Sequence, residues 1–199
     1  MIVGLTGGIG SGKTTVAKLF SNYANVAIYI ADVEAKKLIN SSTSIKQQIT
    51  KLFGANAYKN NILDRKYIGQ LVFNSKAKLQ ALNKIVHPAV KEHFANFVQS
   101  NQNKDYILYE SAILFESNSI EKLDFIISVY VDLEERIQRV MVRDSLEKKE
   151  VLVRINNQWK EDKILLLSNY LIINSSIENT KDQVRKIHNI LTKKALHFL

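Results

Sequence analysis

The chain has 199 residues, no cysteine and a formal net charge of +9 at pH 7, and 46% of its residues are hydrophobic. This length suits one α/β domain with a small insertion, and the lack of cysteine excludes disulfides and thiolate metal sites. No apolar run is long enough to cross a bilayer, so we expect no membrane partner. The basic residues are scattered and lack an RNA-binding motif, which favours small anionic ligands over nucleic acid.

A phosphate-binding loop follows the first predicted strand, Ile2–Thr6. From Gly7 to Thr14 the sequence is GGIGSGKT, a complete Walker A motif, and helical spacing continues from Val16. Such glycines let the backbone aim N–H groups at phosphate oxygens, and the following helix adds its positive end. We expect the Lys13 ammonium to reach the β- and γ-phosphates and the Thr14 hydroxyl to bind Mg²⁺. The early position of this loop leaves no room for a cleavable signal, so we expect a cytoplasmic protein.

Four further apolar runs predict strands at residues 26–30, 106–109, 125–131 and 170–173. With Ile2–Thr6 the sequence therefore predicts five strands. Because the runs are continuously apolar and helical patterns separate several of them, we expect an α/β fold with a doubly wound, five-stranded parallel sheet. Ligands of such sheets bind beyond the carboxyl ends of the strands. Gly7, Asp32, Glu110 and Asp132 all lie at predicted strand ends.

We expect a single domain over 1–199, with its core in residues 1–40 and 105–199. Residues 41–104 are too long for a loop and carry apolar helical stripes, so they predict a helical insertion. Pro88 is the only proline, and it predicts that one helix ends at His87 and the next begins at the proline. The polar stretch at 143–150 predicts a lid that extends to about 158. Thr180 and Gln183 predict a capping box for the last helix.

The remaining motifs favour a small kinase over other phosphate-loop proteins. No glycine has an aspartate three positions before it, and the guanine-reading Asn-Lys-x-Asp is missing, so a GTPase is disfavoured. A kinase needs a carboxylate near the acceptor hydroxyl, and Asp32 directly follows the second predicted strand. The alternative role of Asp32 is to cap a helix over residues 33–38.

The sequence resembles the dephospho-coenzyme A kinase family over nearly its whole length. The resemblance is carried by GLTGGIGSGKTT at the start, Ile30-Ala31-Asp32, Asp64-Arg65, His87-Pro88, ESAILFE at 110–116, Arg139 with Arg143, Gln158 and Asn174. The His-Pro pair and the Leu-Phe-Glu stretch are more specific than the phosphate loop, because many kinases share that loop.

The resemblance implies a P-loop fold similar to the nucleoside monophosphate kinases, with a helical insertion for substrate and a lid. It implies transfer of phosphate from ATP, with Mg²⁺, to the ribose 3′-hydroxyl of dephospho-coenzyme A, the last step of coenzyme A synthesis. We expect no nucleic acid partner and a monomer or weak homo-oligomer. The implied catalytic residues are Asp32, Lys13 and Arg139. The residues implied for ATP binding are Gly8, Gly10, Ser11, Gly12, Lys13, Thr14, Thr15, Arg143 and Asn174. The residues implied for binding the acceptor are Asp32, Arg65, His87, Leu114 and Glu116.

Several points stay open at the level of sequence. His87 is either a substrate contact or a helix cap, and Asp132 either mimics a Walker B carboxylate or starts a helix together with Glu135. Glu110 is the preferred residue for a water-mediated hold on Mg²⁺. The chain departs from the family pattern at Ile30, Glu110, Ala112, Ile164 and Ile173, yet it keeps the loop, the metal-binding hydroxyl and the catalytic carboxylate. The alternative functions are a nucleoside or nucleoside monophosphate kinase and a non-enzymatic, nucleotide-dependent RNA or protein binder.

Overall fold

The computed structural model describes residues 1–73, 75–116 and 123–197, and it divides the chain into two compact units. Met1–Ile30 and Val98–Leu199 form the first unit, and Ala31–Phe97 form the second. Across the described ranges, no helix combines the length and the apolar character that a membrane crossing requires.

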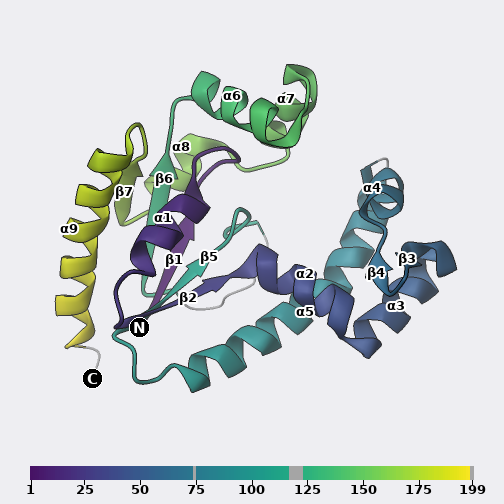
Figure 1. Ribbon diagram of the computed structural model, residues 1–199, viewed down its shortest axis with the longest axis horizontal. Helices are drawn as coiled ribbons and strands as arrows, with labels where there is room; N and C mark the ends of the chain where they lie inside the picture. The colour runs from purple at the N-terminus through teal and green to yellow at the C-terminus, as the bar shows by residue number, and fades with distance from the viewer. Residues whose placement is uncertain (74, 117–122, 198–199) are drawn as a thin grey trace. The chain divides into compact units, whose positions relative to one another are not determined.

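A parallel sheet with the strand order β2-β5-β1-β6-β7 forms the centre of the first unit (Figure 1). Its strands are β1 (Ile2–Thr6), β2 (Val26–Ile30), β5 (Tyr106–Glu110), β6 (Phe125–Tyr130) and β7 (Tyr170–Ile173). All four strand pairs are parallel. The predicted strands are therefore confirmed, with β5 longer and β6 shorter by one residue. Because the strands run the same way, their carboxyl ends meet at one edge.

Helices α1 (Lys13–Phe20) and α9 (Ile177–Ala195) lie side by side and supply the main core of the first unit (Figure 1). Val16 and Phe20 of α1 and Leu191 of α9 are fully buried in one cluster with Leu5 and Ile127 of the sheet. Each such side chain contributes about 1.5–3 kcal/mol through burial. This packing fixes the start of α1, and therefore the phosphate loop, against the end of β1.

The capping box predicted at Thr180 and Gln183 is wrong. Helix α9 begins one turn earlier, where the Ser176 hydroxyl accepts a hydrogen bond from the N–H of Asn179 at 3.3 Å. Ser176 is a good cap because its oxygen satisfies an N–H that the helix leaves unpaired. Thr180 is instead fully buried inside the helix.

Three short helices follow β6: α6 (Leu133–Asp144), α7 (Lys148–Asn156) and α8 (Glu161–Leu166). The Asp132 carboxylate caps α6 by accepting the N–H of Glu134 at 3.0 Å. The helix-starting role of Asp132 is thus confirmed. Glu135, its predicted partner in a capping box, pairs with Arg139 instead.

The second unit contains α2 (Ala31–Ser41), α3 (Thr43–Phe53), η1 (Ala55–Ala57), β3 (Tyr58–Lys59), β4 (Ile62–Leu63), α4 (Arg65–Phe73) and most of α5 (Lys76–Ser100). It has its own small core, in which Ile45, Ile49, Phe53, Ala57 and Ile68 are buried together. Asp64 precedes α4 and accepts the N–H of Tyr67 at 3.0 Å. Hydrogen bonding to Lys59 is the main cause that lowers the pKa of the Asp64 carboxyl.

The predicted break at His87 and Pro88 is wrong, because α5 continues through the proline. A proline inside a helix removes one backbone hydrogen bond and crowds the preceding turn. The apolar stripe of Leu82, Ile85 and Ala89 spans this position and packs against the core of the second unit. Burial on both sides of Pro88 therefore offsets the local cost and keeps one helix.

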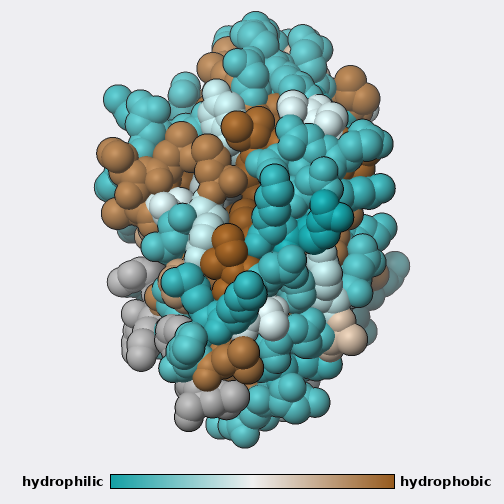
Figure 2. Space-filling view, turned by 90° about the vertical axis from the view of Figure 1, so that its left-hand side faces the viewer, coloured by the Kyte–Doolittle hydropathy of each residue, from teal (hydrophilic) through white to brown (hydrophobic). Residues whose placement is uncertain are grey.

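Hydrophobic residues form a band among hydrophilic ones on the face that Figure 2 presents. Strand β7 is an edge of the sheet, and its Leu171 and Ile173 are exposed, as are Leu166 and Leu167 just before it. Ile172 points the other way and is fully buried. This alternation is what an edge strand with one covered face requires.

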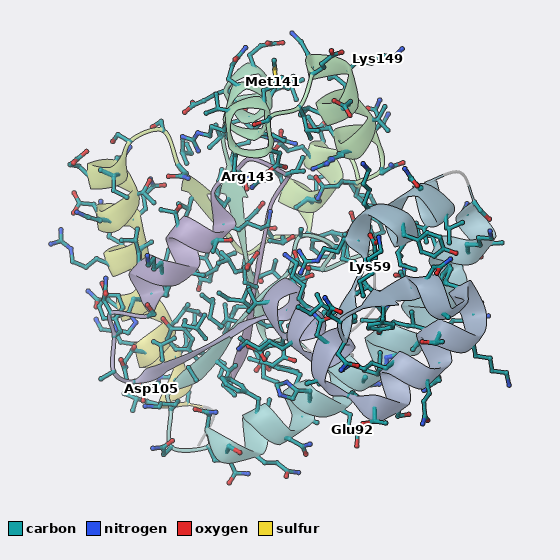
Figure 3. The ribbon with its side chains drawn as sticks, turned by 45° about the vertical axis from the view of Figure 1, so that its right-hand side comes forward. Lys59, Glu92, Asp105, Met141, Arg143 and Lys149 are labelled. Atoms are coloured by element: carbon teal, nitrogen blue, oxygen red, sulfur yellow. The ribbon has the colours of Figure 1, made fainter. Side chains whose placement is uncertain are left out.

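A buried histidine lies at the amino end of β5, away from the phosphate loop. His188 Nδ1 is 2.9 Å from the Tyr106 hydroxyl, and the Tyr23 ring stacks on the imidazole with centroids 3.7 Å apart. Burial lowers the pKa of His188, while Asp105 acts weakly in the other direction. Figure 3 shows Asp105 at the end of the first unit that lies away from Arg143. The folded protein therefore favours the neutral imidazole.

We expect His188 to make stability depend on pH. The unfolded histidine titrates near pH 6.5, and the folded one titrates lower, so the free energy of unfolding falls as pH drops below about 6.5. The loss is at most about 1.4 kcal/mol per pH unit. Urea unfolding of the wild type and His188→Asn at pH 7.5 and 5.5 checks this, because the variant lacks the titrating group and should lose less. Equal losses in both proteins contradict the prediction.

We expect Pro88→Ala to raise the stability of the second unit. The change restores a backbone N–H in the middle of α5, and a proline at such a position costs about 3 kcal/mol before compensation. Thermal unfolding followed by far-ultraviolet circular dichroism should give a higher midpoint for the variant. Ala89→Gly, one residue further along the same helix, should lower it. A lower midpoint for Pro88→Ala would show that the proline is favourable where it stands.

Candidate active site

The phosphate loop joins β1 to α1 and takes a shape that only glycine permits at two of its central positions. The φ angle is 84° at Gly10 and 88° at Gly12, in the left-handed region. A Cβ at Gly12 would lie 2.1 Å from Asn174 Nδ2, and one at Gly10 would lie 2.6 Å from the Arg136 carbonyl oxygen. These glycines therefore allow both the backbone turn and the close approach of neighbouring groups.

The Lys13 ammonium lies over the loop. Its Nζ donates to the Gly7 carbonyl at 2.8 Å and to the Gly8 carbonyl at 3.2 Å, and the residue is only 8% exposed. Among the described residues, the Ser11 hydroxyl is the buried side-chain oxygen that has no hydrogen-bond partner. Buried polar groups are normally paired, so this fully buried hydroxyl is an exception within the loop.

A cavity of about 600 Å³ opens beside the loop. It collects most of the residues predicted for ATP and adds three that the sequence did not single out, Ser175, Ser176 and Ile177. Its lining is Gly10, Gly12, Lys13, Thr14, Thr15, Arg139, Arg143, Asn174, Ser175, Ser176 and Ile177. Within the described ranges this lining includes cationic side chains and no carboxylate, which suits a polyanion. Gly8 and Ser11 are buried parts of the loop and do not line the cavity.

The two predicted arginines come from α6 and each has an acidic partner. Arg139 donates to the Glu135 carboxylate at 2.6 Å and to the Asn174 carbonyl at 3.0 Å. Arg143 binds the two oxygens of the Asp144 carboxylate at 2.8 and 3.0 Å, and this hydrogen bonding raises the pKa of its guanidinium. Figure 3 shows Arg143 beside the phosphate loop. Both guanidinium groups are thus held at the cavity by charge-assisted hydrogen bonds.

Asn174 binds the loop itself. The residue is 6% exposed, and its Nδ2 donates to the Ser11 carbonyl at 2.8 Å. The buried Thr180 hydroxyl donates to Asn174 Oδ1 at 2.9 Å, which orients the amide. Asn174 therefore positions the phosphate loop in addition to lining the cavity.

Gln158 connects the loop to the segment that follows β5. Its Oε1 accepts the N–H of Ile9 at 2.7 Å, and its Nε2 donates to the Ala112 carbonyl at 2.9 Å. The next residue, Trp159, donates its N–H to Glu116 at 2.8 Å and stacks on the Phe115 ring with centroids 5.6 Å apart. One amide thus ties together two segments that the sequence places far apart.

The structure gives each predicted acceptor residue of the first unit a local contact. Leu114 is buried over β1, where a Cβ at Gly4 would lie 2.8 Å from it. Glu116 accepts the Trp159 N–H described above. Their roles toward the acceptor stay predictions.

Asp32, Arg65 and His87 belong to the second unit. The capping role considered for Asp32 is wrong, because α2 begins at Ala31 and Asp32 lies inside its first turn. Arg65 is exposed at the start of α4. His87 is half-buried, which lowers its pKa, and it borders a shallow cavity of about 510 Å³ on α5 with Gln80, Asn83, Lys84 and Pro88. Their roles toward substrate stay predictions.

Two residues with oxygen groups of the kind that Mg²⁺ prefers lie at the carboxyl end of the sheet. Thr14 is exposed in the first turn of α1, and Glu110, which is 3% exposed, ends β5 beside Leu5 of β1. Nowhere in the described ranges do three His, Asp or Glu side chains form a metal cluster. A hydroxyl and one carboxylate fit Mg²⁺ that is bound mainly by phosphate oxygens and water.

Comparison with known proteins identifies the family. The dephospho-CoA kinase family model matches residues 1–179. The chain is 32% identical over 197 residues to the dephospho-CoA kinase of Bacteroides fragilis strain YCH46, covering 99% of this chain and 95% of the relative. It is 34% identical over 199 residues to the dephospho-CoA kinase of Chlorobaculum tepidum, covering 96% and 95%.

Solved structures share the fold. The crystal structure of a Thermus thermophilus protein named TT1252 has a TM-score of 0.85 and 28% sequence identity, with 96% of each chain covered. A family model that spans most of the chain and relatives above 30% identity over nearly its full length agree with the phosphate loop, the parallel sheet and the cationic cavity. The chain therefore belongs to the dephospho-CoA kinase family.

Proposed function

We propose that the protein transfers the γ-phosphoryl group of ATP to the ribose 3′-hydroxyl of dephospho-coenzyme A, the final step of coenzyme A synthesis. The cavity beside the phosphate loop supports this most directly, because Lys13, Arg139 and Arg143 line it in a chain of this family. We further propose that the enzyme is cytoplasmic and works as a monomer or weak homo-oligomer.

The phosphates of ATP are proposed to bind the N–H groups between Gly10 and Thr15. The positive end of α1 favours the anion, and Lys13 exchanges its loop carbonyls for phosphate oxygens. Mg²⁺ would be held by the Thr14 hydroxyl and, through water, by Glu110, and it would neutralise charge on the β- and γ-phosphates. In this arrangement α1 and the loop place the terminal phosphate at the carboxyl edge of the sheet.

Asp32 is the proposed group that accepts the proton of the acceptor hydroxyl. It follows the carboxyl end of β2 by two residues, and the sequence resemblance implies that the catalytic carboxylate stands at this position. A carboxylate that orients the hydroxyl and takes its proton makes the oxygen a better nucleophile. Arg65 and His87 are proposed to contact the acceptor, together with Leu114 and Glu116.

Charge that develops on the transferred phosphoryl group is proposed to be stabilised by Lys13, Arg139 and Arg143. Arg143 is 60% exposed and bonded to Asp144, which also accepts from Arg154 at 2.9 Å. A guanidinium held by a surface carboxylate can move to a phosphate at small cost, because exposed ion pairs are weak. Closure of residues 143–158 over the nucleotide would exclude water from the reaction.

A substrate panel tests the function. ADP release is measured with dephospho-coenzyme A, nucleosides and nucleoside monophosphates as acceptors, and the product is identified by mass spectrometry. We expect turnover with dephospho-coenzyme A and a product that carries one additional phosphate. Faster turnover of a nucleoside monophosphate would contradict the proposal, and salt-dependent RNA binding without ADP release would favour a non-enzymatic role.

We expect Asp32→Asn to lower kcat by about a hundredfold or more while the Kd for ATP stays unchanged, because the amide cannot take the proton. Stopped assays for kcat and calorimetry for ATP binding check this. Glu34→Gln is the matched control, since Glu34 lies in the same turn of α2 and pairs with Lys37. Normal turnover by Asp32→Asn would remove Asp32 from the mechanism.

We expect Asn174→Ala to raise the Kd for ATP about tenfold. The change removes the hydrogen bond to the Ser11 carbonyl and leaves that oxygen and the Thr180 hydroxyl without this partner. Gln183→Ala is the control, because Gln183 holds the Ile173 backbone and makes no described contact with the phosphate loop. Unchanged ATP binding in Asn174→Ala would refute a positioning role for this amide.

A further inference from the structure

Ile9, inside the phosphate loop, has both of its backbone groups bound by side chains from outside the loop. Its N–H donates to Gln158 Oε1 at 2.7 Å, and its carbonyl accepts from Arg136 Nε at 3.1 Å. Arg136 comes from α6, and Gln158 lies between α7 and α8. The loop is therefore held on its outer side at one residue, which leaves the following amides to face the cavity.

Arg136 is a buried cation that pairs with an acidic side chain. The residue is 4% exposed, and its NH1 donates to Glu161 Oε1 at 2.7 Å. Glu161 is the first residue of α8 and is 28% exposed at its side chain. A guanidinium this deeply buried needs such a counter-charge, because an unpaired buried charge is strongly destabilising. The pair therefore connects α8 through Arg136 to the loop.

Gly8 packs directly against this guanidinium. A Cβ at Gly8 would lie 2.2 Å from Arg136 NH2. Gly8 itself does not have a positive φ angle. The need for glycine at this position therefore comes from the arginine side chain and not from the backbone angle. Beneath Gly10, the Arg136 carbonyl also leaves no space for a Cβ.

We propose that Arg136 is a positioning residue for ATP, because the ion pair with Glu161 keeps Ile9 in place and so keeps the loop amides directed at the phosphates. Through this contact α6 and α8 set the affinity of the loop for nucleotide. The inference rests on the proposed ATP-dependent function, yet it concerns nucleotide binding alone. Its outcome therefore does not depend on which acceptor the enzyme uses.

The first test compares Arg136→Met with the wild type. Calorimetry gives the Kd for MgATP, and steady-state kinetics gives kcat and both KM values. We expect the Kd and the KM for ATP to rise about tenfold, while kcat and the KM for dephospho-coenzyme A stay within about twofold. Arg136→Lys, which retains the charge beside Glu161 but lacks the guanidinium fork, should recover part of the affinity. Arg185→Met is the control, since its exposed pair with Asp182 lies on α9.

The second test uses Gly8→Ala in the wild-type and Arg136→Met backgrounds. We expect Gly8→Ala to weaken ATP binding in the wild type, and to do so much less when the shorter methionine leaves space for the new methyl group. This non-additivity is a readout that general loss of stability does not produce. Equal effects in the two backgrounds would overturn the proposed contact.

Two further outcomes decide the inference. If Arg136→Met does not fold, Glu161→Gln replaces it, and an ATP affinity equal to the wild type in that variant overturns the proposal. A folded Arg136→Met protein with normal ATP affinity and only a lower melting temperature also overturns it. Lack of activity of the wild type on dephospho-coenzyme A would instead count against the proposed function and leave the binding result intact.

Discussion

The phosphate loop depends on hydrogen bonds to side chains that lie outside the loop. A glycine-rich loop has little conformational preference of its own, so it needs partners outside the loop to stay in one conformation. Asn174 binds the Ser11 carbonyl, and Gln158 and Arg136 bind the two backbone groups of Ile9. These partners come from three separate stretches, namely the residue after β7, helix α6 and the link between α7 and α8. The nucleotide site is therefore a property of the whole first unit.

Electrostatics gives this scaffold its chemistry. Cations line the cavity, and the acids that pair with them, Glu135 and Asp144, lie outside its lining. Those acids orient the guanidinium groups without placing a carboxylate in the cavity that a triphosphate would occupy. The carboxylates with proposed chemical roles, Glu110 and Asp32, stand at the ends of β5 and β2. The cations of the cavity and these carboxylates are thus on different segments of the chain.

The fold and the nucleotide loop could be predicted because their signals are local. Five continuous apolar runs became the five parallel strands, and the Walker A motif became a strand–loop–helix turn. Helix boundaries were less predictable. Pro88 stayed inside α5 because its neighbours Leu82, Ile85 and Ala89 pack on a core. Helix α9 is capped by Ser176 and not by Thr180 as predicted, because several residues nearby can cap a helix and tertiary packing selects among them.

The order of residues by itself determined the family, the parallel sheet and the type of ligand. Glycine spacing, apolar runs and the lysine of the phosphate loop are local features, and each acts on the backbone or ligand next to it. Tertiary structure alone decided that Arg136, Gln158 and Asn174 hold the loop and that Ser175 to Ile177 line its cavity. No short sequence pattern marks a contact between Ile9 and residue 158. Such contacts arise only when folding brings the ends of parallel strands to one edge, where side chains from distant segments meet the same backbone groups.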